Sequence, residues 1–500
     1  MITLKENNMP KPTVSSAADL ESIYKRALTL LGSRVNKNQE FEEGFELIKQ
    51  LAAQEYAPAQ NKLGLMYRKG HRMDQDDIKV YNKLRLVANR GTAGVVRRNM
   101  RAMYGKVFHI TRNTTKAFDL FKLAAGQKLA EAQYNLGSMY AEGDGVPLDY
   151  KEAARLFQLA AEQLYAPAQY HLGLIHERGY GVAPNYEEAV GWYRLAAEQK
   201  HDLAQTAMGF MCVKGHGVAQ DYKEAFDWFE LAAEQDNIRA QYYLGFMYEE
   251  GVGVAQDLIQ AFNYLKLAAD RGHARAQYRL GVMYEKGNGI VQNLKQARKL
   301  YRLAAAQHHD QALNNLGLMY DRGSGGKRNL TGAFSAFREA AALGLTEAKT
   351  NLGILCVREL GKTDDYIEAR HLFESAAKQR NAEALYNLGI MYEKGYGVDK
   401  DCKKAFGYYK SAVGQSHAQA QYSLGVMYST GCGVTRNYKK AIELFKLAIT
   451  QGIVPALFAL GVMYENGQGV PEDRREARRL YKLAAAEEYQ DAIAALRKIY

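Results

Sequence analysis

The sequence predicts an all-α solenoid, because three features recur along nearly the whole chain. A Leu-Gly dipeptide or its equivalent returns every 36 residues between positions 101 and 461. A second glycine follows six residues after most of these reference positions, and an Asp or Asn follows twelve residues after each of them. A fixed period of this length is typical of stacked supersecondary units. The reference positions are Gly64, a degenerate Arg101, Gly137, Gly173, Gly209, Gly245, Gly281, Gly317, Gly353, Gly389, Gly425 and Gly461.

The first half of each unit predicts a helix, here called helix A. In one copy Ala132, Leu136, Met139 and Tyr140 have the three- and four-residue spacing of a single helical stripe. The reference glycine lies on this stripe and allows a close neighbour. The second glycine is expected to end helix A in the left-handed conformation. It is found at Gly143, Gly179, Gly215, Gly251, Gly287, Gly395, Gly431 and Gly467.

The second half of each unit predicts helix B, which begins at the recurring Asp or Asn. These residues are expected N-caps, and a Glu or Gln three residues later, such as Glu152, predicts a capping box in seven units. Small residues and an aromatic on helix B, such as Ala153 and Phe157, allow close packing on helix A. The expected N-caps are Asp76, Asn113, Asp149, Asn185, Asp221, Asp257, Asn293, Asn329, Asp365, Asp401, Asn437 and Asp473.

The repeated string A-x-x-Y-x-L-G-x-M-Y-x-x-G-x-G-V-x-x-D-x-x-x-A-x-x-x-F-x-x-A-A resembles the Sel-1-like repeat (SLR), a relative of the tetratricopeptide repeat. The resemblance covers about residues 50 to 500. It implies a right-handed α/α superhelix of about twelve 36-residue repeats with capping helices. It also implies that the A helices line a concave surface that holds other proteins.

The ends of the chain depart from the repeat. We expect a flexible N-terminal tail (1–18), a capping helical hairpin (19–56), the repeat solenoid (57–488) and a C-terminal capping helix (489–500). The polar first residues lack the apolar core of a secretory signal, and no window is apolar enough to span a bilayer. These features favour a cytoplasmic protein.

Four cysteines are too few for a disulfide framework in a chain of 500 residues. Cys212 and Cys356 replace the tyrosine of helix A, so we expect them to be buried and inert. SLR proteins with paired cysteines in each repeat differ from this pattern.

Positive charge is concentrated near the N-terminus. Residues 1–112 contain 20 Lys or Arg and 11 Asp or Glu, and residues 79–112 contain no acidic residue. Such a patch attracts acidic protein segments, phosphate backbones or anionic surfaces, although a degenerate repeat can also drift towards basic residues without a function. The candidate residues are Lys83, Arg85, Arg90, Arg97, Arg98, Arg101 and Lys106.

A second candidate site is a groove on the helix A face. In tetratricopeptide proteins that clamp peptides, an asparagine before Leu-Gly contacts the bound chain. The matching residues in three consecutive units are Asn315, Asn351 and Asn387, and basic residues follow at Arg322, Arg358 and Lys394. These residues predict a peptide-binding groove, although asparagine at this position can simply solvate helix A. Gly326 and Lys362 replace the usual valine nearby, and Glu359 replaces the glycine that ends helix A.

The sequence contains no motif that predicts catalysis. The repeated Gly-x-Gly-Val follows a helix, so it is not a dinucleotide fingerprint, and His308 and His309 are weak metal candidates. We expect a non-enzymatic adaptor or scaffold with no cofactor or metal, whose partner is a protein or peptide. A nucleic-acid or anionic-surface binder that uses the basic patch is one alternative. A bacterial effector exported without a cleaved signal is another.

Overall fold

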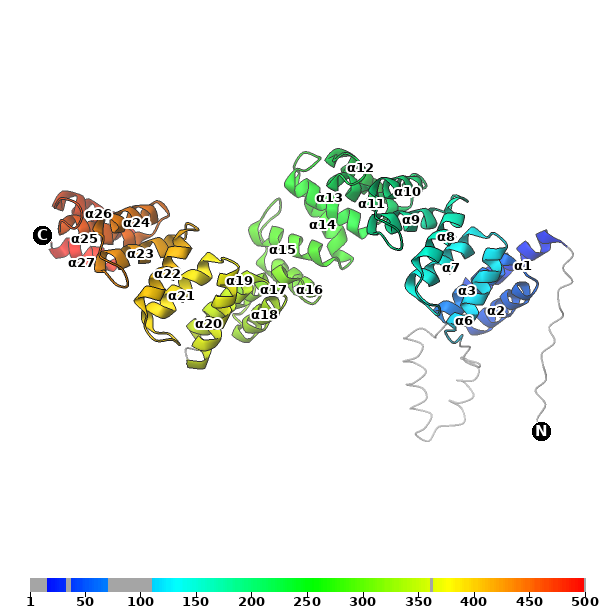
Figure 1. Ribbon diagram of the computed structural model, residues 1–500, viewed down its shortest axis with the longest axis horizontal. Helices are drawn as coiled ribbons and strands as arrows, with labels where there is room; N and C mark the ends of the chain where they lie inside the picture. Colours follow the sequence, from blue (N-terminus) through cyan, green and yellow to red (C-terminus); the bar gives the residue numbers. More distant parts are fainter. Residues whose placement is uncertain (1–15, 33–36, 71–109, 360–362, 499–500) are drawn as a thin grey trace, which may run out of the picture. The chain divides into compact units, whose positions relative to one another are not determined.

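The computed structural model describes residues 16–32, 37–70, 110–359 and 363–498. Within these ranges the regular structure consists of 25 α-helices and one isolated bridge residue, Ile110. The chain divides into two compact units, residues 1–256 and 257–500, each of which is described by itself. The expected all-α fold of repeated helix pairs is confirmed (Figure 1).

The first unit contains two N-terminal helices followed by alternating A and B helices that pack in sequence order. The A helices of this unit are α3, α7, α9, α11 and α13, and its B helices are α6, α8, α10 and α12. The bounds are α1 (Ala17–Gly32), α2 (Lys37–Ala53), α3 (Ala57–Lys69), α6 (Thr114–Gly126), α7 (Ala130–Glu142), α8 (Tyr150–Ala161), α9 (Ala166–Arg178), α10 (Tyr186–Glu198), α11 (Asp202–Lys214), α12 (Tyr222–Glu234) and α13 (Ile238–Glu250).

The second unit begins with a helix B, continues with six A–B pairs and ends with α27, which packs on α26. The bounds are α14 (Leu258–Asp270), α15 (Ala274–Lys286), α16 (Leu294–Ala305), α17 (Asp310–Arg322), α18 (Leu330–Ala342), α19 (Thr346–Glu359), α20 (Thr363–Lys378), α21 (Ala382–Lys394), α22 (Cys402–Val413), α23 (Ala418–Thr430), α24 (Tyr438–Thr450), α25 (Val454–Glu465), α26 (Arg474–Ala486) and α27 (Gln490–Lys498). The assignment of the terminal helices as caps, and of the tail, stays a prediction.

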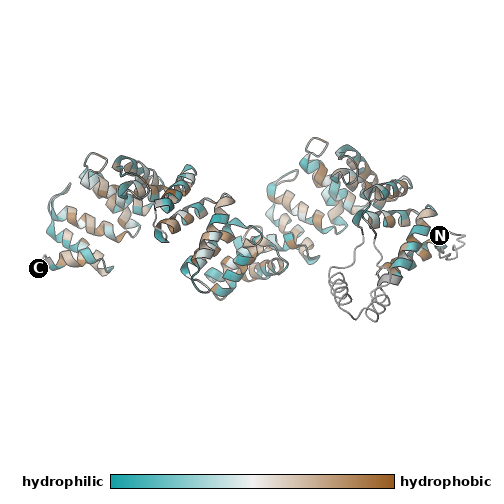
Figure 2. Cartoon of the chain, turned by 90° about the horizontal axis from the view of Figure 1, so that it is seen from below, coloured by the Kyte–Doolittle hydropathy of each residue, from teal (hydrophilic) through white to brown (hydrophobic). Residues whose placement is uncertain are grey.

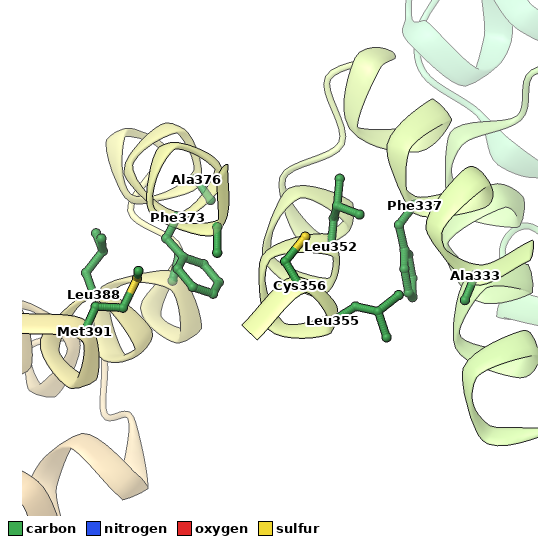
Figure 3. Packing of buried hydrophobic residues seen from close by; sticks show 11 residues of the cluster. Ala333, Phe337, Leu352, Leu355, Cys356, Phe373, Ala376, Leu388 and Met391 are labelled. Carbon is green, nitrogen blue, oxygen red and sulfur yellow. The ribbon is translucent and has the colours of Figure 1, made fainter. Parts of the chain in front are cut away.

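Each described A–B pair within a unit packs an aromatic residue of helix B against the reference glycine of helix A. A Cβ placed on Gly317 would lie 2.6 Å from Cε1 of Phe337, so any larger residue would displace the ring. Figure 3 shows the next layer of this core, where Phe337 and Phe373 lie on either side of Leu352, Leu355 and Cys356. Hydrophobic and hydrophilic stretches alternate along the helices of both units (Figure 2), as the amphipathic periodicity predicts.

The N-terminal repeat is interrupted by residues 71–109. Helix α3 nevertheless packs against α6. The Asn113 N–H donates to Tyr67 O at 2.8 Å, as the Asp149 N–H donates to Tyr140 O at 3.0 Å in the next pair. The units predicted at Gly64 and Arg101 thus supply one described helix pair, and the expected N-cap Asp76 lies outside the described residues.

The helix ends confirm most of the predicted capping residues. Gly143 and its equivalents adopt positive φ, 67° at Gly143, and the side chains of ten predicted N-caps accept backbone N–H bonds. Those ten are Asn113, Asp149, Asn185, Asp221, Asp257, Asn293, Asn329, Asp401, Asn437 and Asp473.

Two capping predictions were wrong. Asp365 lies in the first turn of α20, which begins at Thr363. In the same unit α19 lacks the terminal glycine and runs on to Glu359. In a capping box the Glu152 side chain would accept a hydrogen bond from the Asp149 backbone N–H. That bond is absent, because the Asp149 N–H already donates to the preceding helix A. The Glu152 carboxylate instead pairs with Arg155 at 2.6 Å.

Two sets of partly buried polar pairs join neighbouring helices. A glutamine after helix B donates to a buried glutamine of the preceding helix A, as from Gln163 Nε2 to Gln133 Oε1 at 2.8 Å. Where helix B carries tyrosine at the core position, the hydroxyl donates to a helix A glutamate, as from Tyr301 to Glu285 at 2.6 Å. The other tyrosine pairs are Tyr193–Glu177, Tyr409–Glu393 and Tyr481–Glu465.

Histidines at the start of helix A are N-caps. The Nδ1 atoms of His201 and His309 accept the backbone N–H of Ala204 and Ala312 at 3.2 and 3.3 Å. Asn237 fills the same role with its side-chain oxygen. Burial lowers the pKa of both histidines, because the charged imidazole is poorly solvated there.

These histidine caps predict a loss of stability in mild acid. The unfolded pKa is about 6.5 and the folded pKa is lower, so the unfolded chain binds more protons and stability falls as the pH drops below about 6.5. Between pH 7 and 5.5 we therefore expect the thermal midpoint to fall, which thermal unfolding followed by circular dichroism measures. The double variant His201→Asn/His309→Asn keeps both caps and should lose part of this dependence. An equal pH dependence in the variant would contradict the assignment.

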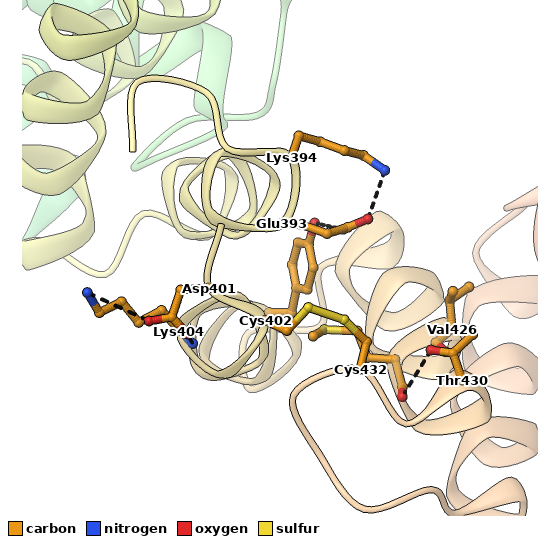
Figure 4. The surroundings of a disulfide bond; sticks show 10 residues. Glu393, Lys394, Asp401, Cys402, Lys404, Val426, Thr430 and Cys432 are labelled. Carbon is orange, nitrogen blue, oxygen red and sulfur yellow. Dashed lines mark hydrogen bonds and ion pairs between the residues drawn. A yellow bond between two sulfur atoms is a disulfide. The ribbon is translucent and has the colours of Figure 1, made fainter. Parts of the chain in front are cut away.

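The cysteines differ from the expectation in one respect. Cys402, at the start of α22, and Cys432, in the loop after α23, form a disulfide across neighbouring repeats (Figure 4). One disulfide is not a framework, but the sequence did not predict this pair. Cys212 and Cys356 are fully buried as expected, and burial raises the pKa of their thiols to about 12 and about 11.

Candidate functional site

The three asparagines of the predicted groove lie on successive A helices, α17, α19 and α21, and each is half-buried. Their amide nitrogens make internal bonds. Asn315 Nδ2 lies 3.3 Å from the Tyr301 hydroxyl, and Asn351 Nδ2 donates to Asn314 Oδ1 at 2.9 Å. Asn387 Nδ2 donates to the Glu383 backbone oxygen at 2.8 Å.

The side-chain oxygens of Asn315, Asn351 and Asn387 accept no hydrogen bond from the described part of the chain. Because the amide nitrogens are already held, each oxygen is fixed in place as an acceptor. Three such acceptors on consecutive A helices can accept hydrogen bonds from the backbone N–H groups of an extended peptide.

The predicted cations of the groove differ from one another. Arg358 contacts Asp321 at 2.5 Å and Glu359 at 2.9 Å, and Lys394 contacts Glu393 at 2.9 Å. Arg322 is exposed and forms no ion pair with the described residues. Only Arg322 therefore presents a charge that no neighbouring carboxylate offsets.

Arg358 belongs to a charge cluster at the end of α19. Arg328 reaches the same two carboxylates, Asp321 at 3.3 Å and Glu359 at 2.5 Å. Burial raises the pKa of Asp321, but hydrogen bonds from Arg358 and Arg328 outweigh it and leave this pKa below its ordinary value. Glu359, which replaces the usual glycine, thus ties the helix end to the preceding repeat.

The basic patch lies outside the described residues except at 110–112, where Arg112 pairs with Asp144 at 2.6 Å. All its candidates are outside: Lys83, Arg85, Arg90, Arg97, Arg98, Arg101 and Lys106. Its role stays a prediction.

The weak metal candidates have other partners. His308 Nδ1 lies 2.7 Å from Glu339, and His309 Nδ1 is occupied as an N-cap. Among the residues that the structure describes, no group of three or more His, Cys, Asp or Glu could hold a metal ion.

The sequence did not predict one open pocket of about 510 Å³ in the second unit. It lies between helix α16 and the loop before α18, and basic side chains dominate its lining. The signal available in the sequence was Gly326 at a position that most other repeats fill with valine or isoleucine.

Comparison with known proteins agrees with this architecture. The sequence model of the Sel1 repeat matches twelve segments between residues 57 and 489, which together span most of the chain. The chain belongs to the Sel1 repeat family. The first two matches, 57–79 and 100–128, overlap α3 and α6, which form one pair in the structure.

Solved structures of Sel1 repeat proteins are also similar. The protein c5321, a protective antigen of uropathogenic Escherichia coli with an SLR fold, is 29% identical. The match covers 91% of this chain and 90% of that one with a TM-score of 0.76. A Sel1 repeat protein from Oxalobacter formigenes is 29% identical over 66% of this chain and 85% of its own, with a TM-score of 0.46. A search of curated protein sequences finds no match.

Proposed function

We propose that this Sel1 repeat protein is a non-enzymatic scaffold that holds a partner protein or peptide. The observation that carries the proposal is the series of fixed asparagine oxygens on α17, α19 and α21. Repeat arrays of this kind offer extended binding surfaces because each unit presents the same helix to the same side. The partner, the pathway and the choice between monomer and homodimer are not specified by these features.

The proposed peptide site consists of Asn315, Asn351 and Asn387 with Arg322, Arg358 and Lys394. Asn351 is central, since it lies between the other two asparagines along the array. We expect Asn351→Ala to weaken partner binding about tenfold or more, because a lost hydrogen bond to a desolvated partner costs about 1–3 kcal/mol. Binding can be measured by calorimetry with the captured partner.

The control for this variant is Asn135→Ala in the first unit. Asn135 Nδ2 donates to Asn61 Oδ1 at 2.9 Å, the same internal bond that Asn351 makes to Asn314. Removing it therefore reproduces the structural cost without touching the proposed groove. Unchanged binding by Asn351→Ala, or equal losses in both variants, would refute the groove.

The basic 79–112 segment supports an additional proposal of an acidic partner, and an alternative of nucleic-acid or anionic-surface binding. Binding through counterion release would weaken steeply as salt increases. The variant Arg97→Glu/Arg98→Glu/Arg101→Glu separates these proposals from the groove, because it leaves the second unit unchanged.

The compartment is also a proposal. The structure has no described helix long and apolar enough to cross a membrane. The sequence favoured the cytoplasm, whereas the Cys402–Cys432 disulfide favours an oxidising compartment, where disulfides persist. The likeness to a protective antigen supports the alternative of an exported bacterial protein.

Alkylation of intact source cells before lysis distinguishes the two locations. For an exported protein we expect the peptides containing Cys402 and Cys432 to be recovered as a disulfide. If both cysteines were alkylated, the cytoplasmic location would stand and the exported alternative would fail.

A further inference from the structure

The open pocket of the second unit is strongly basic. It is lined by Lys295, Arg298, Lys299 and Arg302 from α16 and by Tyr320, Gly325, Gly326, Lys327, Arg328 and Asn329 from the next repeat. Six of these ten residues are cations and none is acidic. The sequence from Lys286 through His309 also contains no Asp or Glu. A pocket lined by positive charges attracts negatively charged ligands.

Two departures from the repeat pattern, Arg298 and Gly326, lie together in the lining of the pocket. The position of Arg298 is phenylalanine in five other repeats, and the position of Gly326 is valine or isoleucine in most others. A Cβ on Gly326 would lie 2.3 Å from Nη1 of Arg298. The Arg298 guanidinium therefore lies where the first atom of a valine side chain would stand, whereas the equivalent pair of positions in another repeat holds Arg370 and Val398.

The arginine is held in a defined position. Its guanidinium lies 4.4 Å from the centre of the Tyr320 ring, where other repeats have edge-to-face aromatic pairs such as Phe118–Tyr140. Nη1 and Nη2 donate to the backbone oxygen of Lys327 at 3.3 Å. Arg298 has no carboxylate partner among the described residues, whereas Arg370, at the same position in another repeat, contacts Glu374 at 3.1 Å.

The exposed cations form a row. Lys295, Lys299 and Arg302 lie at i, i+4 and i+7 on one side of α16, and all three are exposed. At 1.5 Å per residue the row is about 10 Å long. None of the three forms an ion pair with the described residues, and Lys327 is equally exposed and unpaired across the pocket.

We propose that this pocket binds an acidic segment of a partner protein, with successive carboxylates placed along the row. An extended peptide rises about 3.3 Å per residue, so carboxylates on alternate residues are about 6.6 Å apart and match a row of about 10 Å. A single phosphate would contact only part of this row of cations. This inference rests on the proposed scaffold function and specifies the chemistry of a partner.

The test uses the full-length protein and a fluorescent peptide of about eight alternating Asp and Glu residues, with an Asn/Gln peptide as the neutral probe. The site variant is Lys295→Gln/Lys299→Gln/Arg302→Gln. The matched control is Lys439→Gln/Lys440→Gln/Lys446→Gln, which removes three exposed cations from α24 of the same unit. Gly326→Val restores the usual residue and should displace Arg298.

We expect the site variant to bind the acidic peptide at least tenfold more weakly than the wild type, and Gly326→Val to bind it several-fold more weakly. The control variant should bind within twofold of the wild type, and the neutral peptide should not bind. Equal losses in the site and control variants, or no loss in the site variant, would overturn the proposal. So would tighter binding of inorganic phosphate or tripolyphosphate than of the peptide.

Failure of this pocket can be told apart from failure of the scaffold function. If the acidic peptide does not bind but a protein partner is still captured by the site variant, only the pocket is refuted. If neither the peptide nor any protein partner binds the wild type, both proposals fail.

Discussion

Replacing Phe337 by alanine is expected to lower the free energy of unfolding of the surrounding repeats by about 3–5 kcal/mol. The ring is 1% exposed and fills the gap above Gly317, where it contacts the core of the second unit. Its removal leaves a cavity that the closely packed helices cannot close. Urea denaturation, followed by hydrogen exchange of α17, α18 and α19, measures the loss and its location.

The control for this variant is Leu447→Ala on α24. Leu447 is 50% exposed, so its truncation should change stability by only about 0.5 kcal/mol or less. Because each repeat contacts only its neighbours, protection should fall most in α17–α19 and least in α25 and α26. A small loss for Phe337→Ala, or a loss spread evenly over the unit, would contradict this packing.

Removal of the Cys402–Cys432 disulfide is expected to have the next largest effect. The bond closes a loop of 30 residues that contains α22 and α23. In the chain-entropy model such a cross-link contributes about 3–4 kcal/mol by restricting the unfolded chain. Cys402→Ser/Cys432→Ser should therefore unfold at a clearly lower urea concentration than the oxidised wild type.

Reductant provides the matched control for this prediction. It should lower the stability of the wild type towards that of the double variant and leave the double variant unchanged. If reductant destabilised both proteins equally, its action would not pass through this bond, and the assigned role of the disulfide would be wrong.

The sequence predicted the helix pairs because their signals are local. The reference glycine, the aromatic that covers it and the Asp or Asn N-cap recur with one period, and each acts within its own unit. The changed end of α19 has the same local origin, since Glu359 lacks the left-handed preference of the glycine that it replaces and is still helical.

Contacts between repeats were harder to predict, because they join different positions of neighbouring units. Cys402 and Cys432 occupy a pair of positions 30 residues apart that holds stacked rings elsewhere, such as Tyr150–Tyr180 at 4.9 Å. The glutamine pairs share this separation. The disulfide becomes visible in the sequence only when one unit is compared with the next at this offset.

The sequence predicted which residues would make up the candidate groove, but not which of their charges are already paired. The asparagines lie on consecutive A helices, yet Arg358 and Lys394 are already paired with carboxylates. Asp321 precedes Arg358 by 37 residues, and Glu393 is adjacent to Lys394. Neither pair has the i, i+3 or i, i+4 spacing that predicts an ion pair on a helix. The basic pocket at Arg298 was missed because most of its residues come from a helix B and from the loop after the next helix A.

The measurement that tests the scaffold function most directly is affinity capture from a lysate of the source cell with nuclease present, at low and high salt. Wild type is compared with Asn351→Ala and with Arg97→Glu/Arg98→Glu/Arg101→Glu. We predict a defined protein partner that survives nuclease and high salt and is lost with Asn351→Ala. Recovery of nucleic acid alone, or of nothing after nuclease and salt, would contradict the scaffold function and leave the basic 79–112 segment as the working surface.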